Sequence, residues 1–197
     1  MIEITTERLR LRQWRATDFP VFASMNAEAE VMEHYPHRLT RQESNQLASR
    51  FQELITVQGW GYWAVEQLTD ERFMGFVGLH KPNYDFHINP CIEIGWRLAK
   101  TYWGQGFATE AAKASLDIAF RQLQIDEIHS FTAVTNRRSE SVMKRLGMVN
   151  TERNFPHPMV PEGSHLKEHV LYKIDKNQWQ EHCRQTNLKS ANVFISA

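Results

Sequence analysis

The residues best suited to chemistry include a short segment in which two glycines directly precede an amphipathic stretch. Gly104 and Gly106 flank Gln105, and the residues from Phe107 onward carry small and apolar side chains at helical spacing. A strand that passes through a glycine turn into a helix exposes backbone N–H groups that have no partner within the helix. Because glycine lets the backbone approach an anion closely, this segment predicts a phosphate or pyrophosphate site.

Two common phosphate-binding patterns do not fit this turn. A P-loop requires G-x-x-x-x-G-K-[ST], which the sequence does not contain. A dinucleotide fingerprint requires a third glycine or alanine, where Thr109 stands, and an acidic residue about 20 positions later, after a second strand. Taken alone, the turn favours an ordinary structural role, so its meaning depends on the elements around it.

Glu93 is the side chain most suited to proton transfer. It lies in the apolar stretch Cys91–Leu98, which is typical of a central strand. A carboxylate in such a strand is costly unless it is paired or functional, and burial raises its pKa toward that of a general base. Strand alternation places Arg97 on the same face, so an ion pair with Arg97 is the structural alternative. His80, at the end of another expected strand, is a second candidate base.

Composition narrows the class of protein. The 197 residues include 23 Lys+Arg and 23 Asp+Glu, so the net charge is zero and nothing favours a direct nucleic-acid partner or an anionic membrane. No uncharged apolar run approaches the ~20 residues of a membrane helix. Cys91 and Cys183 have no CxxC spacing and are expected to be free thiols in a reducing compartment. We therefore expect a cytoplasmic protein.

A metal site is not expected. His157, His165 and His169 lie close together in the sequence, but no Cys or Asp accompanies them at ligand spacing, and the segment crosses from a loop into a strand. These histidines are alternatively candidates for the wall of a substrate cleft, as are Tyr35, Pro36 and Trp63, although ordinary packing is the favoured explanation for all of them.

The remaining elements alternate between strand and helix. Strands are expected at residues 2–14, 60–67, 72–80, 91–98, 128–134, 148–152 and 168–174. Helices are expected at 18–27, from a capping box at Thr40 and Glu43 to Gly59, at 107–123, at 136–146, and from 176 onward with Trp179 as its anchor and a frayed tail at 189–197. This order predicts an α+β fold with a mixed sheet: one domain at 1–175, followed by a C-terminal helix and tail at 176–197.

Three segments together resemble the GNAT acetyltransferases. Tyr102-Trp-Gly-Gln-Gly-Phe-Ala-Thr-Glu-Ala111 is similar to the family's acetyl-CoA pyrophosphate loop, with Trp103 in the Q/R place of the pattern Q/R-x-x-G-x-G/A. Asn136-Arg-Arg-Ser139 followed by Leu146-Gly-Met148 is similar to N-x-x-S…L-G-F, and Thr6–Arg12 looks like the opening strand. The segments span about residues 3 to 174, and the resemblance is greatest to the branch of the ribosomal-protein acetyltransferases RimJ and RimL.

The resemblance implies where a cosubstrate would lie. It implies a mostly antiparallel sheet, flanked by helices, that opens as a V between the strands at 91–98 and 128–134, with acetyl-CoA in the opening and no metal. The cofactor-binding residues that it implies are Trp96, Leu98, Gln105, Gly106, Phe107, Ala108, Thr109, Asn136 and Ser139. Asn136 is alternatively a plain helix cap, and Ser139 an ordinary residue of the first helical turn.

The resemblance also implies a reaction: direct attack on the thioester by a primary amine, belonging to a protein N-terminus or a small molecule. Glu93 would then be the base. The family's usual acid is a Tyr in the helix after Asn136, but Met143 stands in that place here, so Ser139 or Ser141 is the candidate partner of the departing thiolate. A non-catalytic CoA-binding regulatory module of the same fold is the alternative. The acceptor stays unidentified, with polyamines or aminoglycosides among the candidates, and a homodimer is compatible with the sequence.

Overall fold

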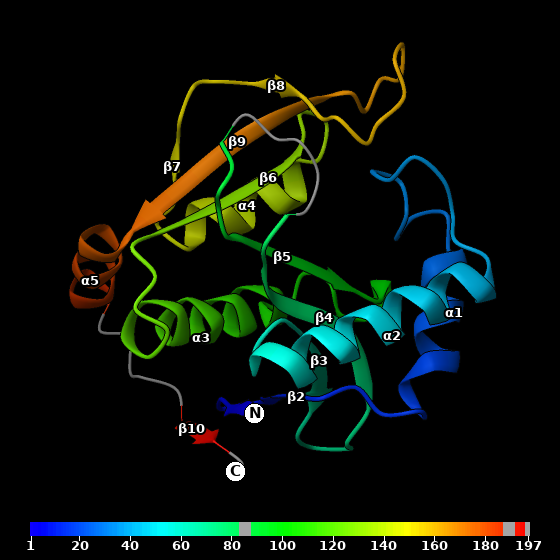
Figure 1. The fold of residues 1–197 in the computed structure, drawn as a ribbon, viewed down its shortest axis with the longest axis horizontal. Coiled ribbons are helices and arrows are strands. Elements are labelled where there is room, and N and C mark those ends of the chain that lie inside the picture. Colours follow the sequence, from blue (N-terminus) through cyan, green and yellow to red (C-terminus); the bar gives the residue numbers. More distant parts are fainter. Residues whose placement is uncertain (83–87, 187–191, 196–197) are drawn as a thin grey trace.

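A mixed β-sheet runs through the computed structural model, which describes residues 1–82, 88–186 and 192–195 (Figure 1). Its strands are β1 (Ile2–Thr5), β2 (Leu9–Arg12), β3 (Tyr62–Gln67), β4 (Phe73–His80), β5 (Glu93–Leu98), β6 (Glu127–Ala133), β7 (Val149–Asn150), β8 (Phe155–Pro156), β9 (Glu168–Asp175) and β10 (Asn192–Ile195). The helices are α1 (Asp18–Ala27), α2 (Arg41–Gln58), α3 (Phe107–Arg121), α4 (Arg137–Arg145) and α5 (Lys176–Gln185), with a 3₁₀ turn η1 (Lys100–Tyr102).

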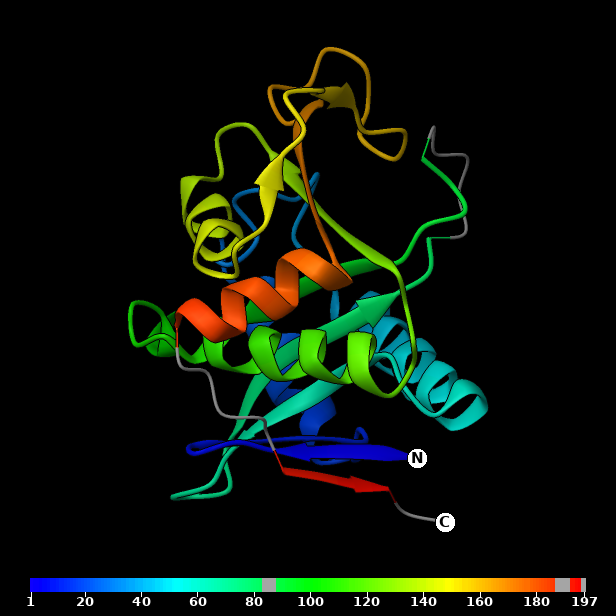
Figure 2. The ribbon, with the colours of Figure 1, turned by 90° about the vertical axis from the view of Figure 1, so that its left-hand side faces the viewer.

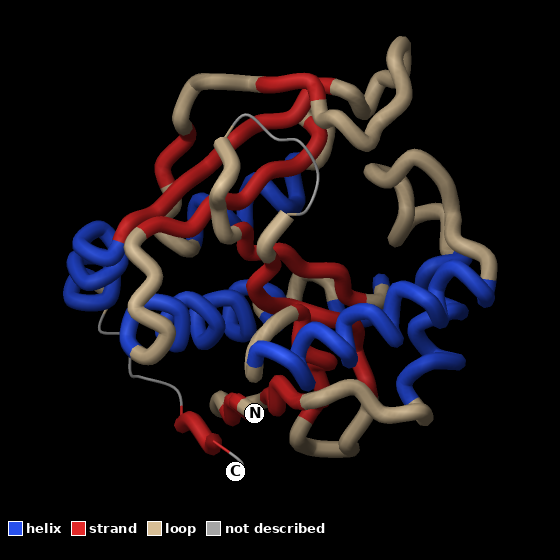
Figure 3. Tube along the Cα trace, in the orientation of Figure 1, coloured by secondary structure: helices blue, strands red, loops and turns tan. Residues whose placement is uncertain are grey.

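The sheet has the order β10-β1-β2-β3-β4-β5-β6-β9-β7, with β8 paired to β9. Every described pair of strands is antiparallel except β5 and β6, which are parallel. Helices α1 and α2 cover one face of the sheet, and α3 and α5 lie side by side on the other (Figure 2). The long connections between α1 and α2 and between β8 and β9 reach the same end of the molecule (Figure 3). The expected α+β fold is confirmed.

The sheet opens between its two parallel strands. Only Glu93 and His129 are in register across β5 and β6, where the His129 N–H donates to the Ile92 carbonyl at 2.9 Å. The Ser130 hydroxyl closes the junction by donating to the Ile94 carbonyl at 3.0 Å. From Gly95 to Leu98, β5 is paired only with β4. The expected V is therefore present, and the open edge of β5 forms one of its walls.

Local signals account for the ends of the helices. The Thr40 and Glu43 side chains form the expected capping box at the start of α2, and Gly59, with φ of 83°, ends it in the left-handed conformation. Trp179 is buried against Phe120, so α5 docks as expected. The proposed boundary at residue 175 stays a prediction.

Two expectations at the chain termini are wrong. The stretch 2–14 is two strands, because the chain turns at Thr6, whose N–H donates to the Leu9 carbonyl. The tail is not frayed throughout, because β10 pairs with β1 along its whole length (Figure 2). Residues 187–191 and 196–197 lie outside the described residues.

A buried ion network joins the first strands to α1. The Arg12 guanidinium, on a side chain 3% exposed, donates to both Asp18 oxygens at 2.7 and 2.9 Å and to Glu66 at 2.7 Å. Arg10 and Arg15 pair with the same Glu66 from more exposed positions. Loss of the central cation would leave two buried carboxylates short of counter-charge.

We expect Arg12→Met to lower the free energy of unfolding by about 3–5 kcal/mol, because breaking a buried ion pair leaves uncompensated charge. Arg10→Met is the matched control: its side chain is 37% exposed, and about 1 kcal/mol or less is expected. Urea unfolding followed by circular dichroism measures both. Equal losses for the two variants would show that the network does not depend on Arg12.

Candidate active site

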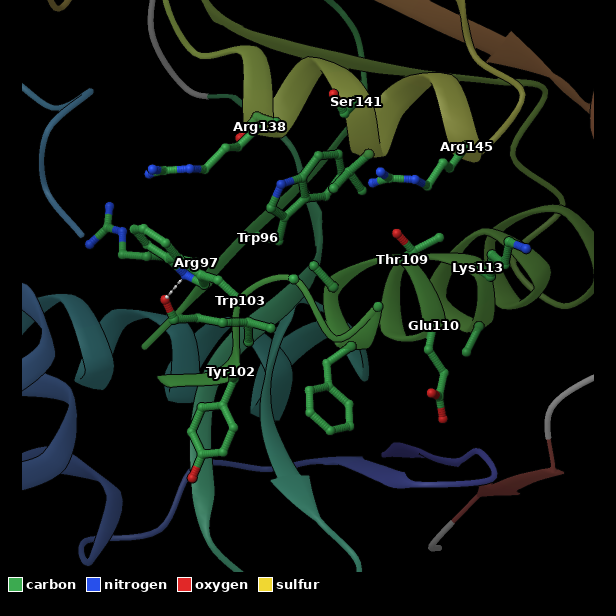
Figure 4. A pocket seen from close by; sticks show the side chains of 18 of the residues that line it. Trp96, Arg97, Tyr102, Trp103, Thr109, Glu110, Lys113, Arg138, Ser141 and Arg145 are labelled. Carbon is green, nitrogen blue, oxygen red and sulfur yellow. Dashed lines mark hydrogen bonds between the residues drawn. The ribbon is translucent and has the colours of Figure 1, made fainter. Parts of the chain in front are cut away.

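A cleft of about 1340 Å³ lies in the opening of the V. One wall comes from β5, η1 and the start of α3, and the other comes from α4. One end reaches Tyr35 and Arg97, and the other reaches Trp179 and Cys183 on α5. Figure 4 shows α4 on one side, α3 on the other and Trp96 between them.

The glycine turn lies at the centre of this cleft. Gly104 and Gly106 have φ of 73° and 82°, a conformation that favours glycine, and Gly106 is the N-cap of α3. Gly106, Phe107, Ala108 and Thr109 all line the cleft. The first-turn N–H groups have no acceptor within the helix, so this end of α3 is suited to an anion, and the expected site stays a prediction.

The side chain of Arg8 holds this turn in place through three contacts that the sequence did not predict; we call them the Arg8 clamp. Arg8 donates to the Gln105 carbonyl at 3.1 Å, pairs with Glu110 at 2.6 Å and stacks over the Phe107 ring at 4.3 Å. Glu110 also accepts hydrogen bonds from the Thr6 hydroxyl and the Arg8 N–H. The loop between β1 and β2 thus holds the turn in place and neutralises the carboxylate beside the anion site. Only tertiary contacts 97 to 104 residues apart reveal this arrangement.

Besides Arg97 at one end, three cations line the cleft. Arg138 and Arg145 project from one face of α4, seven residues apart, and Lys113 lies one turn after Thr109 on α3 (Figure 4). Arg138 also lies over the Trp103 ring at 4.8 Å. The spacing of Arg138 and Arg145 at i and i+7 was the available sequence signal for a basic face. The cleft is therefore suited to a ligand with several negative charges.

Glu93 lies at the apex of the V, where β5 and β6 are still in register. It is buried, and its Oε1 accepts a hydrogen bond from the Tyr62 hydroxyl at 2.8 Å. Burial raises the pKa of Glu93 to about 7, although the Tyr62 hydrogen bond opposes this shift. His80 stacks on Tyr62 at 5.4 Å, and burial lowers its pKa to about 4. A carboxyl group with a pKa near neutrality can exchange protons at working pH.

Comparison with known proteins decides the family. The family model described as "Acetyltransferase (GNAT) domain" matches residues 8–149, which is more than half of the chain. The chain belongs to the GNAT acetyltransferase family. Its members transfer acetyl groups, and this chain is accordingly an acetyltransferase.

Individual relatives agree with this assignment. The chain is 24% identical to "Uncharacterized N-acetyltransferase YnaD" of Bacillus subtilis, over 90% of this chain and 99% of the relative. It is 30% identical to "Putative ribosomal N-acetyltransferase YdaF" of the same organism, over 57% and 59%, which supports the resemblance to the ribosomal-protein branch. A solved GNAT acetyltransferase from Bacillus anthracis has the same fold, with a TM-score of 0.73, 22% identity and coverage of 89% and 99%.

Most of the residues assigned through the GNAT resemblance line the cleft. The cleft is lined by Trp96, Leu98, Gly106, Phe107, Ala108, Thr109, Asn136, Ser139 and Ser141. Gln105 does not line it, because its side chain turns back to the Thr101 carbonyl. Asn136 caps α4 by accepting from the Ser139 N–H, and it donates to Thr132 at 2.9 Å. Asn136 is thus a helix cap, and the same residue also lines the cleft.

Glu93 itself does not line the cleft, although its strand forms the wall. The alternative ion pair with Arg97 is not formed: Arg97 donates to Asn26 and stacks on Tyr35 at 3.9 Å. Met143, whose thioether carries no acidic proton, is buried at the position of the family's usual tyrosine. Ser141 is among the residues that line the cleft, and its hydroxyl donates to the Arg137 carbonyl at 2.8 Å.

The other candidate residues separate into different environments. Tyr35 lines the cleft, whereas Trp63 is fully buried and donates to the Ile2 carbonyl, so its proposed cleft role is wrong. The His157 and His169 rings lie 4.7 Å apart against Phe155. Within the described residues, no three His, Cys, Asp or Glu side chains gather as a metal site. None of the described helices combines the length and apolarity of a membrane span.

We expect the protein to lose stability as the pH falls from about 6.5 to about 4. Burial, with the nearby His169 and Lys167, lowers the pKa of His157 to about 4 from its ordinary 6.5. Between these values the unfolded chain binds a proton that the folded chain does not, so the free energy of unfolding decreases with acidification. Urea unfolding of wild type and His157→Phe across this range measures the effect. The variant should show a shallower dependence on pH, and identical slopes would contradict the assignment.

Proposed function

We propose that this chain transfers the acetyl group of acetyl-CoA to the primary amine of a protein N-terminus or a small molecule by direct attack on the thioester. The observation that carries the proposal is the continuity of the cleft. It leads from the anion site at Gly106 along the open edge of β5 toward the apex of the V, where Glu93 lies. The edge of β5 thus has the proposed anion site at one end and, at the other end, a carboxyl group with a pKa of about 7.

The residues of the cleft fit acetyl-CoA. The N-terminus of α3, clamped by Arg8, is suited to the pyrophosphate, and Arg138 adds a cation beside it. The backbone of β5 at Trp96 and Leu98 has no neighbouring strand on its open side, so it can hydrogen-bond the amides of pantetheine. The Leu98 carbonyl already accepts from the Trp103 indole at 2.8 Å, which leaves Trp96 as the better backbone partner.

Proton transfer explains the catalytic role of Glu93. Bound acetyl-CoA supplies an activated acyl thioester, and the acceptor must lose a proton to form the new C–N bond. Glu93 takes that proton through an ordered water, since its carboxyl group is buried beside Tyr62 rather than exposed in the cleft. Ser141 donates a hydrogen bond to the thiolate after the C–S bond breaks, by turning its hydroxyl away from Arg137. No covalent acyl-enzyme is needed, and neither cysteine takes part.

The family name does not identify the acceptor. The relative named for ribosomal N-acetylation supports a protein N-terminus, and the exposed Glu28, Glu30 and Glu33 near the cleft would suit a cationic amine. Lys100 pairs with Glu30 and Arg138 lies near Glu33, so both carboxylates are partly neutralised. This weakens the argument for a cationic small-molecule amine as the acceptor. We propose a cytoplasmic reaction, since acetyl-CoA is an intracellular metabolite and both cysteines are free thiols.

A turnover assay tests the function. Acetyl-CoA is offered together with spermidine, an aminoglycoside or short peptides with free N-termini, and thiol release and product mass are followed. We expect release of CoA with matching acetylation of a free amine, and none with the same peptide blocked at its N-terminus. Tight binding of acetyl-CoA without acetylation of any amine would instead support the non-catalytic CoA-binding module.

A further inference from the structure

Arg97 lies on the same face of β5 as the proposed base. Because side chains alternate along a strand, Glu93 and Arg97 point to one face. The hydrogen bond from Arg97 to Asn26 of α1 identifies it as the face that α1 and α2 cover, whereas α3 and its glycine turn lie on the other (Figure 2). An acceptor that approaches Glu93 from the side opposite the cosubstrate therefore passes Arg97, which lines the cleft.

Neutral groups hold the guanidinium of Arg97 in position. Its Nη1 donates to the Asn26 Oδ1 at 2.8 Å, and the buried Asn26 is itself oriented by its 2.9 Å hydrogen bond to the Ser44 hydroxyl. The guanidinium carbon lies 3.9 Å from the centre of the Tyr35 ring and 5.4 Å from that of Phe76. Stacking of this kind fixes the plane of a guanidinium without neutralising its charge. The cation is therefore preorganised.

The protein leaves the charge of Arg97 uncompensated. Within the described residues, Arg97 forms no ion pair, and its buried Nε–H has no hydrogen-bond acceptor. The carboxylates of the adjoining connection are engaged elsewhere: Glu30 pairs with Lys100 at 2.6 Å. Glu33 lies 3.9 Å from Arg138. Partial burial of an unpaired cation is costly, and proteins depart from full pairing chiefly at functional sites.

The chemistry of this cation defines what would bind to it. A guanidinium presents a planar fork of donors that matches a carboxylate. One uncompensated positive charge balances the single negative charge of a carboxylate, whereas a phosphomonoester carries close to two. A polycation such as spermidine would be repelled at the same place. The group that suits Arg97 is therefore a carboxylate on the acceptor.

Strand geometry limits the size of such an acceptor. Glu93 and Arg97 are four positions apart, which places their Cα atoms about 13 Å apart along β5. A carboxylate hydrogen-bonded to Arg97 and an amine linked to Glu93 through water take up most of that distance. A few carbon atoms between the amine and the carboxylate are enough to fill the rest.

We propose that Arg97 binds the carboxylate of the acceptor, so that the enzyme acetylates the amino group of a free amino acid. This inference rests on the proposed function, since it assumes that Glu93 marks the reacting end of the cleft. The amino nitrogen forms the C–N bond as the C–S bond breaks. Of the two protons that the ammonium group loses, one ends on the thiolate and the other leaves through Glu93, while the carboxylate stays ionised at Arg97.

Pairs of amino acids and their carboxamides test the proposal. Acetyl-CoA is offered with the common α-amino acids, β-alanine and γ-aminobutyrate, each beside its own carboxamide, and kcat/KM is measured from CoA release. We expect at least one amino acid to react with a kcat/KM about 10- to 100-fold above that of its carboxamide. Because a carboxamide leaves more of the amine unprotonated at neutral pH, the protonation state of the amine cannot produce this preference.

Variants of Arg97 locate the preference. Arg97→Gln should lower kcat/KM for the preferred amino acid to about that of its carboxamide, mainly by raising KM, and it should still bind acetyl-CoA if the cleft is folded. Arg97→Lys keeps the charge without the fork and should give an intermediate ratio. Arg41→Gln removes an exposed cation at the start of α2 that does not line the cleft. This control should keep the wild-type ratio.

The outcomes separate the role of Arg97 from the proposed function. Wild type that acetylates carboxamides, spermidine or peptides at least as well as every amino acid overturns the role of Arg97 and leaves the acetyltransferase proposal standing. No acetylation of any amine overturns the proposed function and this inference with it. A preference for the acid that survives in Arg97→Gln assigns carboxylate recognition to other residues. If Arg97→Gln does not fold, the full wild-type ratio in Arg97→Lys would contradict recognition by the fork.

Discussion

Replacing Glu93 with glutamine is expected to lower kcat/KM for acetyl transfer by about 10²- to 10⁴-fold, the usual contribution of a general base. The amide has nearly the same shape but cannot accept a proton from the amine. Because Glu93 lies at the apex of the V and does not line the cleft, the Kd for acetyl-CoA should not change. Steady-state kinetics together with a binding titration measure both quantities. A variant with wild-type kcat/KM would exclude Glu93 as the base.

The pH dependence supplies an independent test of the same role. A base must be deprotonated, and the pKa of Glu93 is about 7, so kcat/KM should rise toward a plateau with an apparent pKa near 7. The Tyr62 hydroxyl stabilises the carboxylate, so Tyr62→Phe should raise that apparent pKa and shift the acid limb to higher pH. A limb that does not move in Tyr62→Phe would assign it to another group.

Replacing Gly106 with tryptophan is expected to weaken acetyl-CoA binding by more than about 100-fold. The residue is the N-cap of α3, and a side chain there would project where the pyrophosphate must approach the first-turn N–H groups. A Cβ at this position would meet only Arg8 Nη2, at 3.6 Å, which is ordinary van der Waals contact, so the backbone has room for a side chain to begin there. The positive φ adds about 1–2 kcal/mol of strain, which is smaller than the stability of a typical domain.

Gly59→Trp is the matched control for this substitution. Gly59 has φ of 83°, nearly equal to the 82° of Gly106, and a Cβ there would meet no atom within 4 Å. It ends α2, outside the cleft, so the control carries the same backbone strain and the same bulk. Its Kd for acetyl-CoA should equal that of wild type. Equal loss of binding in both variants would attribute the effect to strain rather than to occupation of the anion site.

Sequence patterns predicted the elements whose signals are local. Thr40, Glu43 and Gly59 define α2 through its caps, and Gly104 and Gly106 mark the start of α3. The break between β1 and β2 was missed because no glycine or proline marks it. That turn is held by Glu110, about a hundred residues away. The pairing of β10 with β1 was also missed because it depends on a long-range contact, between opposite ends of the chain.

The sequence predicted those site residues that the GNAT pattern places at strand and helix ends. Gly106, Trp96 and Asn136 lie on the cleft as the GNAT pattern implies, because the pattern follows the strand and helix termini. The partner of Glu93 could not be chosen from spacing alone: Arg97 shares its face, yet Tyr62 of a different strand makes the contact. Spacing also cannot show that Arg97 is left without an ion pair among the described residues, since the carboxylates of the connection between α1 and α2 pair with other cations.

Calorimetric titration of the wild-type chain with acetyl-CoA tests the central claim most directly. The structure predicts one site with a dissociation constant of about 1–100 µM, since the anion site, the clamp from Arg8 and the open edge of β5 are already formed. Absence of binding at about 1 mM ligand would contradict the account, because the cleft would then share the GNAT fold without holding the acyl donor.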